Sequence, residues 1–130
     1  MSTRIAATAI AGSLMLLALA PAHAQLWNGP LKNTPVQHFT DEDMRLFMEA
    51  WNKALDSTPE HGTVSWQNPA TKSHGDLTVA STFTWQKHPC RRLRIVSEAR
   101  GHQGDSMLDL CRVDEKWRAV SSSQLKEQGR

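Results

Sequence analysis

The sequence predicts an α+β fold in which one N-terminal amphipathic helix packs on a four- to five-stranded antiparallel β-meander, with one disulfide. Over residues 44–55, apolar side chains recur every three or four positions, which is typical of a helix with one buried face. From residue 62 almost to the end, apolar and polar residues alternate, which is typical of strands. Because each element has one apolar face to bury, we expect two packed layers.

The first 24 residues predict a cleavable export signal. Arg4 supplies a positive charge, residues 5–19 are apolar and uncharged, and residues 22–24 form an A-x-A cleavage site. We therefore expect a mature protein that begins at Gln25 and is periplasmic or secreted. The first cysteine is Cys90, so we expect no lipid anchor. No later apolar run approaches the ~20 residues that cross a bilayer, so no transmembrane span is predicted.

Residues 25–39 contain two prolines and show no apolar period, so they are predicted to form an extended N-terminal arm. Thr40 is the predicted N-cap of the helix, because the acidic residues 41–43 that follow it suit the positive end of a helix dipole. The helix is expected to end before Pro59. Its apolar face should carry Met44, Phe47, Met48, Trp51, Ala54 and Leu55.

Alternation and turn residues predict five strands after the helix, at about residues 64–66, 77–85, 90–99, 105–113 and 116–120. In the second strand, Leu77, Val79, Ser81, Phe83 and Trp85 are expected to share one face, with Trp85 in the core. The domain is predicted to span residues 40–121. Residues 122–130 are predicted to form a polar C-terminal tail.

Cys90 and Cys111 are the only cysteines, and in an oxidising compartment we expect them to form one disulfide. A redox dithiol or a zinc site is a weaker interpretation, because neither the C-x-x-C spacing nor a sufficient number of thiols is present. If the two cysteines are paired across the third and fourth strands, Arg92 lies beside Asp109 and Leu93 faces Leu108. The leucine side should then contact the helix, and the cysteine side should face solvent or a partner.

Several classes of function find no support in the sequence. The formal net charge is +2, or +1 without Arg4, and acids are interleaved with bases, so no nucleic-acid partner is expected. His61 and His88 fall at one end of the predicted meander and His74 and His102 at the other, so the four cannot converge on a metal ion. A two-histidine site at either end stays open, but no metal or cofactor is predicted.

Enzymatic motifs are not found. The sequence contains no G-x-S-x-G and no H-E-x-x-H motif, and bonded cysteines cannot act as nucleophiles. The acidic residues 41–43 are explained by the start of a helix. We therefore predict no catalytic residue and a protein that is not an enzyme.

A set of short motifs resembles the C-terminal domain of the rickettsial-type seventeen-kilodalton outer-membrane surface antigens. These motifs are Ala54-Leu55, Gly62, Trp66-x-Asn68-Pro69, Gly75, Cys90-Arg91, Cys111-Arg112 and Asp114-x-x-Trp117. The likeness covers about residues 44–120. It implies a bacterial envelope protein with a small β-rich domain and no catalytic site. The chain departs from that family in lacking a lipidated cysteine and a glycine-rich spacer, and in having Asp114-Glu115 where Asp-Gly is usual.

The function expected from these features is a non-enzymatic envelope protein of the surface-antigen type, which acts as a binding or accessory subunit of a periplasmic or outer-membrane assembly. The candidate partner-binding residues are Arg91, Arg92, Arg94 and Arg112. For Arg91, a structural role is favoured, with its guanidinium bonded to helix-end carbonyls. The alternative function is a periplasmic inhibitor or immunity protein that blocks a hydrolase or toxin, with residues 70–74 or 87–89 as the protruding loop.

Overall fold

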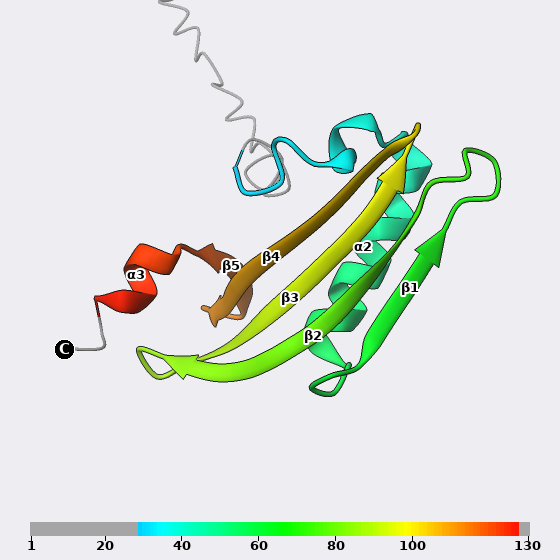
Figure 1. Cartoon of the computed structure of the whole chain (residues 1–130). Helices are drawn as coiled ribbons and strands as arrows, with labels where there is room; N and C mark the ends of the chain where they lie inside the picture. The colour runs from blue at the N-terminus through cyan, green and yellow to red at the C-terminus, as the bar shows by residue number, and fades with distance from the viewer. Residues whose placement is uncertain (1–28, 128–130) are drawn as a thin grey trace, which may run out of the picture.

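The computed structural model describes residues 29–127 and has the predicted α+β architecture (Figure 1). A short 3-10 helix precedes one long helix, and five strands and a final short helix follow. These elements are η1 (Pro35–His38), α2 (Asp41–Asp56), β1 (Thr63–Gln67), β2 (His74–Trp85), β3 (His88–Ala99), β4 (His102–Val113), β5 (Lys116–Val120) and α3 (Ser122–Lys126). The predicted export signal, residues 25–28 of the predicted arm and residues 128–130 lie outside the described residues.

The helix α2 begins and ends where the sequence predicts. The Thr40 hydroxyl accepts a hydrogen bond from the backbone N–H of Asp43 at 3.2 Å, and the Asp43 carboxylate accepts one from the backbone N–H of Thr40 at 3.0 Å. This reciprocal capping box satisfies two N–H groups that the first turn of a helix leaves unpaired. On the predicted apolar face, Phe47, Trp51, Ala54 and Leu55 are buried, and Met44 and Met48 pack against the core.

The five strands form one antiparallel sheet in the order β1-β2-β3-β4-β5, so each strand pairs with its neighbour in the chain. Cys90 pairs with Cys111 across β3 and β4, and their sulfur atoms are bonded at 2.04 Å. The predicted register is therefore confirmed. The strands β2, β3 and β4 begin two or three residues before their predicted starts, at His74, His88 and His102.

The prediction that β2 alternates without interruption is wrong. Val79 pairs with Leu93 and Ser81 pairs with Arg92, so Ala80 is an extra residue on β2. Such a bulge shifts the alternation by one residue and turns the following side chains to the other face. Ser81, Phe83 and Trp85 therefore lie on the face opposite Leu77 and Val79, and Trp85 is not a helix-to-sheet contact.

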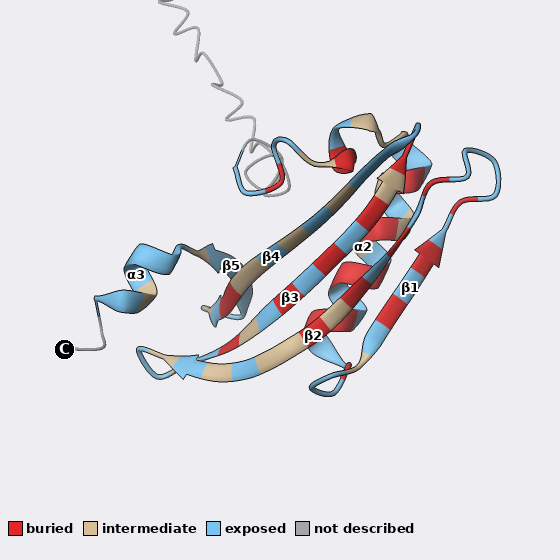
Figure 2. Cartoon of the chain, in the orientation of Figure 1, coloured by how far each residue is buried: buried red, intermediate tan, exposed pale blue. Residues whose placement is uncertain are grey.

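The core lies between α2 and the sheet face of Leu77, Leu93 and Leu110, which are 0 % exposed. In Figure 2 the strand β3 alternates between buried and exposed residues, as expected for a strand with one covered face. Trp51, which the sequence predicts on the apolar face of the helix, is part of this core at 4 % exposed, and so is Trp66 of β1 at 6 % exposed. Trp117 packs against the core and donates a hydrogen bond to Asp56 of α2 at 2.9 Å.

The segment before α2 differs from the extended arm that the sequence predicts. Its described part forms a turn and the helix η1, and it buries Leu31 and Val36 in the core. Pro35 packs against Gly104 of β4 so closely that a Cβ atom at position 104 would lie 2.5 Å from the proline ring. The segment is therefore a third element packed at one end of the sheet, and Gly104 makes that contact possible.

The predicted C-terminal tail also begins with regular structure. Ser121 and Gln124 form a capping box that starts α3, and Leu125 is the residue of α3 that is not fully exposed. In the part of the chain that the structure describes, no helix has the length and apolar character needed to cross a membrane.

Candidate functional site

The face of the sheet opposite α2 is covered by no long element of residues 29–127, and Figure 1 views the molecule from this side, with α2 behind the sheet. We call it the open face. The paired registers place every second side chain of the strands on this face. These residues are Thr63, Ser65, Gln67, His74, Asp76, Thr78, Ser81, Phe83, Trp85, His88, Cys90, Arg92, Arg94, Val96, Glu98, Gln103, Asp105, Met107, Asp109, Cys111, Val113, Lys116, Arg118 and Val120.

Two large apolar side chains stand out on the open face. Val96 is 39 % exposed and Met107 is 53 % exposed, and among the described residues they are the exposed large hydrophobic side chains. Arg94 pairs with Met107 and Val96 pairs with Asp105, so Val96 and Met107 are diagonal neighbours. Exposed apolar side chains grouped in this way are typical of an interaction surface.

A hollow of about 480 Å³ lies beside Val96 on the same face. It is lined by His74, Gly75, Asp76, Val96, Ser97, Glu98, Gln103, Gly104 and Asp105. We call this part of the open face, formed by residues 74–78, 94–98 and 103–107, the acidic end. Its carboxylates belong to three neighbouring strands and surround an apolar side chain.

A second hollow of about 540 Å³ lies at the other end of the open face, which we call the aromatic end. Its lining residues are Ser81, Thr82, Phe83, Thr84, Trp85, Arg92 and Leu125. The bulge at Ala80 brings Phe83 and Trp85 to this side, and Leu125 of α3 lies at the same hollow. The buried Nε1 atom of Trp85 has no hydrogen-bond partner among the described residues.

The structure separates the four arginines predicted to bind a partner. Arg92 and Arg94 lie on the open face and form two-atom ion pairs with Asp109 and Asp105, with closest distances of 2.7 Å and 2.5 Å. The Asp109 hydrogen bond raises the pKa of Arg92, and the Arg94 hydrogen bond lowers the pKa of Asp105. Both guanidinium groups are therefore oriented by neighbouring strands.

The other two arginines lie on the covered side. Arg91 donates hydrogen bonds through Nη1 to the carbonyl oxygen of Ala54, at 2.8 Å, and to that of Thr58. The helix-end role favoured for Arg91 is therefore observed. Arg112 is exposed and pairs across the strands with Trp117, at the edge of the covered face. The four do not form one binding cluster.

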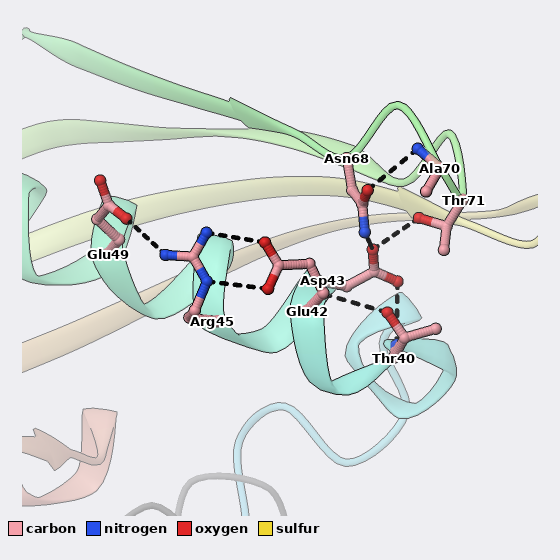
Figure 3. A network of polar contacts seen from close by, with 8 residues as sticks. All are labelled: Thr40, Glu42, Asp43, Arg45, Glu49, Asn68, Ala70 and Thr71. Atoms are coloured by element: carbon pink, nitrogen blue, oxygen red, sulfur yellow. Dashed lines mark hydrogen bonds and ion pairs between the residues drawn. The ribbon is translucent and has the colours of Figure 1, made fainter.

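A buried polar network joins the start of α2 to the loop between β1 and β2 (Figure 3). Asp43 is 0 % exposed, and its Oδ1 atom accepts hydrogen bonds from Asn68 Nδ2 at 2.7 Å and from Thr71 Oγ1 at 2.6 Å. Burial opposes ionisation of this carboxyl, but the hydrogen bonds from Thr71, Thr40 and Asn68 outweigh burial and lower its pKa. The network holds the loop against the helix, so we assign it a structural role.

The histidines form no metal centre in the described part of the chain, where no group of three or more potential ligands is close enough to hold a metal ion. His74 lies 3.4 Å from Glu98 on the open face, and they form an ion pair when the imidazole is protonated. His102 stacks on His38 of η1, with ring centroids 4.2 Å apart. Sequence reasoning placed His74 and His102 at the same end of the sheet but missed the His38 contact.

The fold and this surface define a class of protein: a small disulfide-linked α+β domain with one covered and one open sheet face. No family model matches the chain, and comparisons with curated proteins and with solved structures found no similar protein. The assignment of function therefore depends on the surface itself.

Proposed function

We propose that this protein is a non-enzymatic, exported accessory subunit of the bacterial cell envelope that binds a partner protein through the open face. One observation carries the proposal: Val96 and Met107 are exposed together on a sheet face that no long element within residues 29–127 covers. Burial of both side chains against a partner would release water from apolar surface, which favours association.

The composition of the open face supports a protein partner. Aromatic residues, methionine and arginine are enriched at protein interfaces, and the open face contains Phe83, Trp85 and Met107 together with three arginines. Its ion pairs, Arg92–Asp109 and Arg94–Asp105, fix the guanidinium groups before binding. Less side-chain freedom is then lost when a partner binds.

The expected compartment has separate support. The Cys90–Cys111 disulfide suits an oxidising environment outside the cytoplasm. The motifs shared with the surface antigens, and the signal predicted at residues 1–24, support the cell envelope as that environment. Export and envelope location remain part of the proposal.

The test is an affinity capture from periplasmic and outer-membrane fractions with the mature chain, residues 25–130. Met107→Asp adds a negative charge to the open face, whereas Asn52→Asp adds the same charge to an exposed position of α2. We expect the wild-type chain and Asn52→Asp to retain the same stoichiometric envelope protein and Met107→Asp to lose it. Equal capture by all three proteins, or capture of no envelope protein, would contradict the proposal.

The inhibitor or immunity function is a second candidate, which the loop between β1 and β2 favours. Asn68 Oδ1 accepts a hydrogen bond from the backbone N–H of Ala70 at 3.1 Å, and Thr71 is bonded to Asp43 (Figure 3). The loop is therefore ordered before any partner binds, which reduces the entropic cost of inserting it into a cleft. Capture of a single hydrolase or toxin that Lys72→Glu abolishes and Met107→Asp leaves intact would favour this function.

A further inference from the structure

We propose that the acidic end of the open face binds an extended segment of the partner protein in which a lysine or arginine lies next to an aliphatic side chain. This inference rests on the proposed function and specifies the chemistry of the partner. It uses three observations: the exposed apolar pair, the charge around it, and the size of the surface that is free.

The exposed pair and the hollow define where the segment binds. Val96 lines the hollow, and Met107 is its diagonal neighbour, so an aliphatic side chain placed there contacts both. The hollow extends over β2, β3 and β4, because residues of all three strands line it. An extended segment that crosses these strands can therefore contact Val96 and the flanking carboxylates at the same time.

The charge of the acidic end selects a basic segment. The carboxylates of Asp76, Glu98 and Asp105 line the hollow. Arg94 neutralises Asp105, and Ser65 and Gln103 donate neutral hydrogen bonds to Asp76 and Glu98. Apart from His74, the acidic end has three carboxylates and one guanidinium group. The remaining negative charge is complementary to a lysine or arginine and repels a nucleic acid.

The size of the free surface favours a segment over a second copy of this chain. The aromatic end has Leu125 of α3 at its hollow, so the acidic end is the part of the open face that is not obstructed in this way. Three strands about 4.8 Å apart and five residues long cover roughly 250 Å². A stable complex of two folded proteins buries about 800 Å² on each partner, about three times this area.

The test is an NMR titration of the ¹⁵N-labelled mature chain with two acetylated, amidated peptides, Lys-Leu-Lys-Leu-Lys and Glu-Leu-Glu-Leu-Glu. We expect the basic peptide to shift the amide signals of Asp76, Val96, Glu98 and Asp105, and the acidic peptide to leave them unchanged. Spermidine serves as a cation without an aliphatic side chain, and we expect it to bind more weakly than the basic peptide.

Two double variants test whether binding of the basic peptide depends on the carboxylates of the acidic end or only on the net charge of the protein. Asp76→Asn with Glu98→Gln removes two carboxylates from the hollow, and we expect it to weaken binding of the basic peptide between about threefold and tenfold. Glu49→Gln with Glu115→Gln makes the same change of charge at exposed positions outside the acidic end and should leave binding unchanged. A rise in salt to about 0.5 M should weaken the wild-type complex.

The inference is overturned if the basic peptide causes no shifts, if its shifts lie outside the acidic end, or if the acidic peptide or spermidine binds equally well. An unchanged affinity in the Asp76→Asn, Glu98→Gln variant overturns it as well. Failure of the proposed function is a separate result, which the capture experiment reports as equal capture by the wild-type chain, Asn52→Asp and Met107→Asp, or as capture of no envelope protein. If capture is lost in Met107→Asp but unchanged in the Asp76→Asn, Glu98→Gln variant, the proposed function is supported and the inference of a basic segment is contradicted.

Discussion

The two faces of the sheet are built from alternate residues of the same strands, and β3 shows the contrast most directly. Leu93, Ile95 and Ser97 point toward α2 and are at most 3 % exposed, whereas Arg94 and Val96 lie between them in sequence and point away. The covered face fixes the helix on the sheet. The open face contributes little to this packing, so its residues can be used for binding at small cost to the fold.

The carboxylates of the covered side and of the open face also differ in their burial and in the number of hydrogen bonds that they accept. Asp43, on the covered side, accepts hydrogen bonds from a helix and a loop and is fully buried. Asp76, on the open face, accepts a hydrogen bond from Ser65 and remains exposed. A buried carboxylate with several donors stabilises the fold, whereas an exposed one keeps free acceptor positions for a ligand.

The largest expected difference is between Leu93→Ala and Val96→Ala. Leu93 is 0 % exposed, so its truncation should leave a cavity and lower the free energy of unfolding by about 2–5 kcal/mol. Val96→Ala removes an exposed side chain and should cost less than about 1 kcal/mol. Urea unfolding followed by tryptophan fluorescence measures both values, and similar losses would contradict the division into two faces.

The second-largest loss of stability is expected from removal of the disulfide, which joins β3 and β4 at the aromatic end of the open face. Its cysteines are 21 residues apart, and the loop-entropy estimate for such a link is about 3 kcal/mol. We expect the free energy of unfolding of the Cys90→Ser, Cys111→Ser double variant to be lower by this amount, so that the variant unfolds at a lower urea concentration. The wild-type protein fully reduced by dithiothreitol serves as the control and should behave in the same way. An unchanged midpoint in both proteins would rule out this stabilising role.

Asp43→Asn should lower the free energy of unfolding by about 1–3 kcal/mol, because the amide cannot accept all the hydrogen bonds of the carboxylate. The pKa of Asp43 is lowered in the folded protein, so its contribution is complete above the unfolded value, near pH 4. That contribution is lost as the pH falls through the lower folded pKa.

Unfolding measured between pH 7 and pH 2 should therefore show a steeper acid loss for the wild-type protein than for Asp43→Asn. Asp76→Asn is the matched control on the open face and should retain the acid loss of the wild type. If Asp43→Asn and the wild type lose stability in parallel, the buried network does not have the assigned role.

The smallest expected effects come from the arginines, and they again differ between the two sides. Arg91→Met should cost about 1–2 kcal/mol, because the carbonyl oxygens of Ala54 and Thr58 lose a charged donor. Arg94→Met breaks an exposed ion pair with Asp105, and we expect no measurable change in the unfolding midpoint. A larger effect at Arg94 than at Arg91 would reverse the assignment of structural and exposed arginines.

Much of the fold could be predicted from local pattern. The helix start, the five strands, and the pairing of β3 with β4 follow from capping residues, alternation and the two cysteines. The bulge at Ala80 could not be predicted in this way, because apolar residues continue at every second position through Phe83 and Trp85. The signal for α3 was present, since Ser121 and Gln124 have the spacing of a capping box.

The candidate site was predicted less well than the fold. Sequence reasoning selected arginines by type, but Arg91, Arg92 and Arg94 are engaged by carbonyl or carboxylate groups that only the three-dimensional arrangement identifies. Val96 and Met107 were missed, although the predicted register already placed both on the cysteine side of the sheet. An apolar residue on a face expected to be solvated is the signal that could have identified them.

The strict chain order of the sheet has a consequence for how the protein reaches its native state. Because every strand pairs with the one before or after it, most pairing closes short loops, and the contact order of the sheet is low for a β-rich domain. Folding can then proceed hairpin by hairpin, with each new strand pairing with the one before it. Under the proposed export, this order would let the chain cover its apolar residues soon after it had crossed the membrane unfolded.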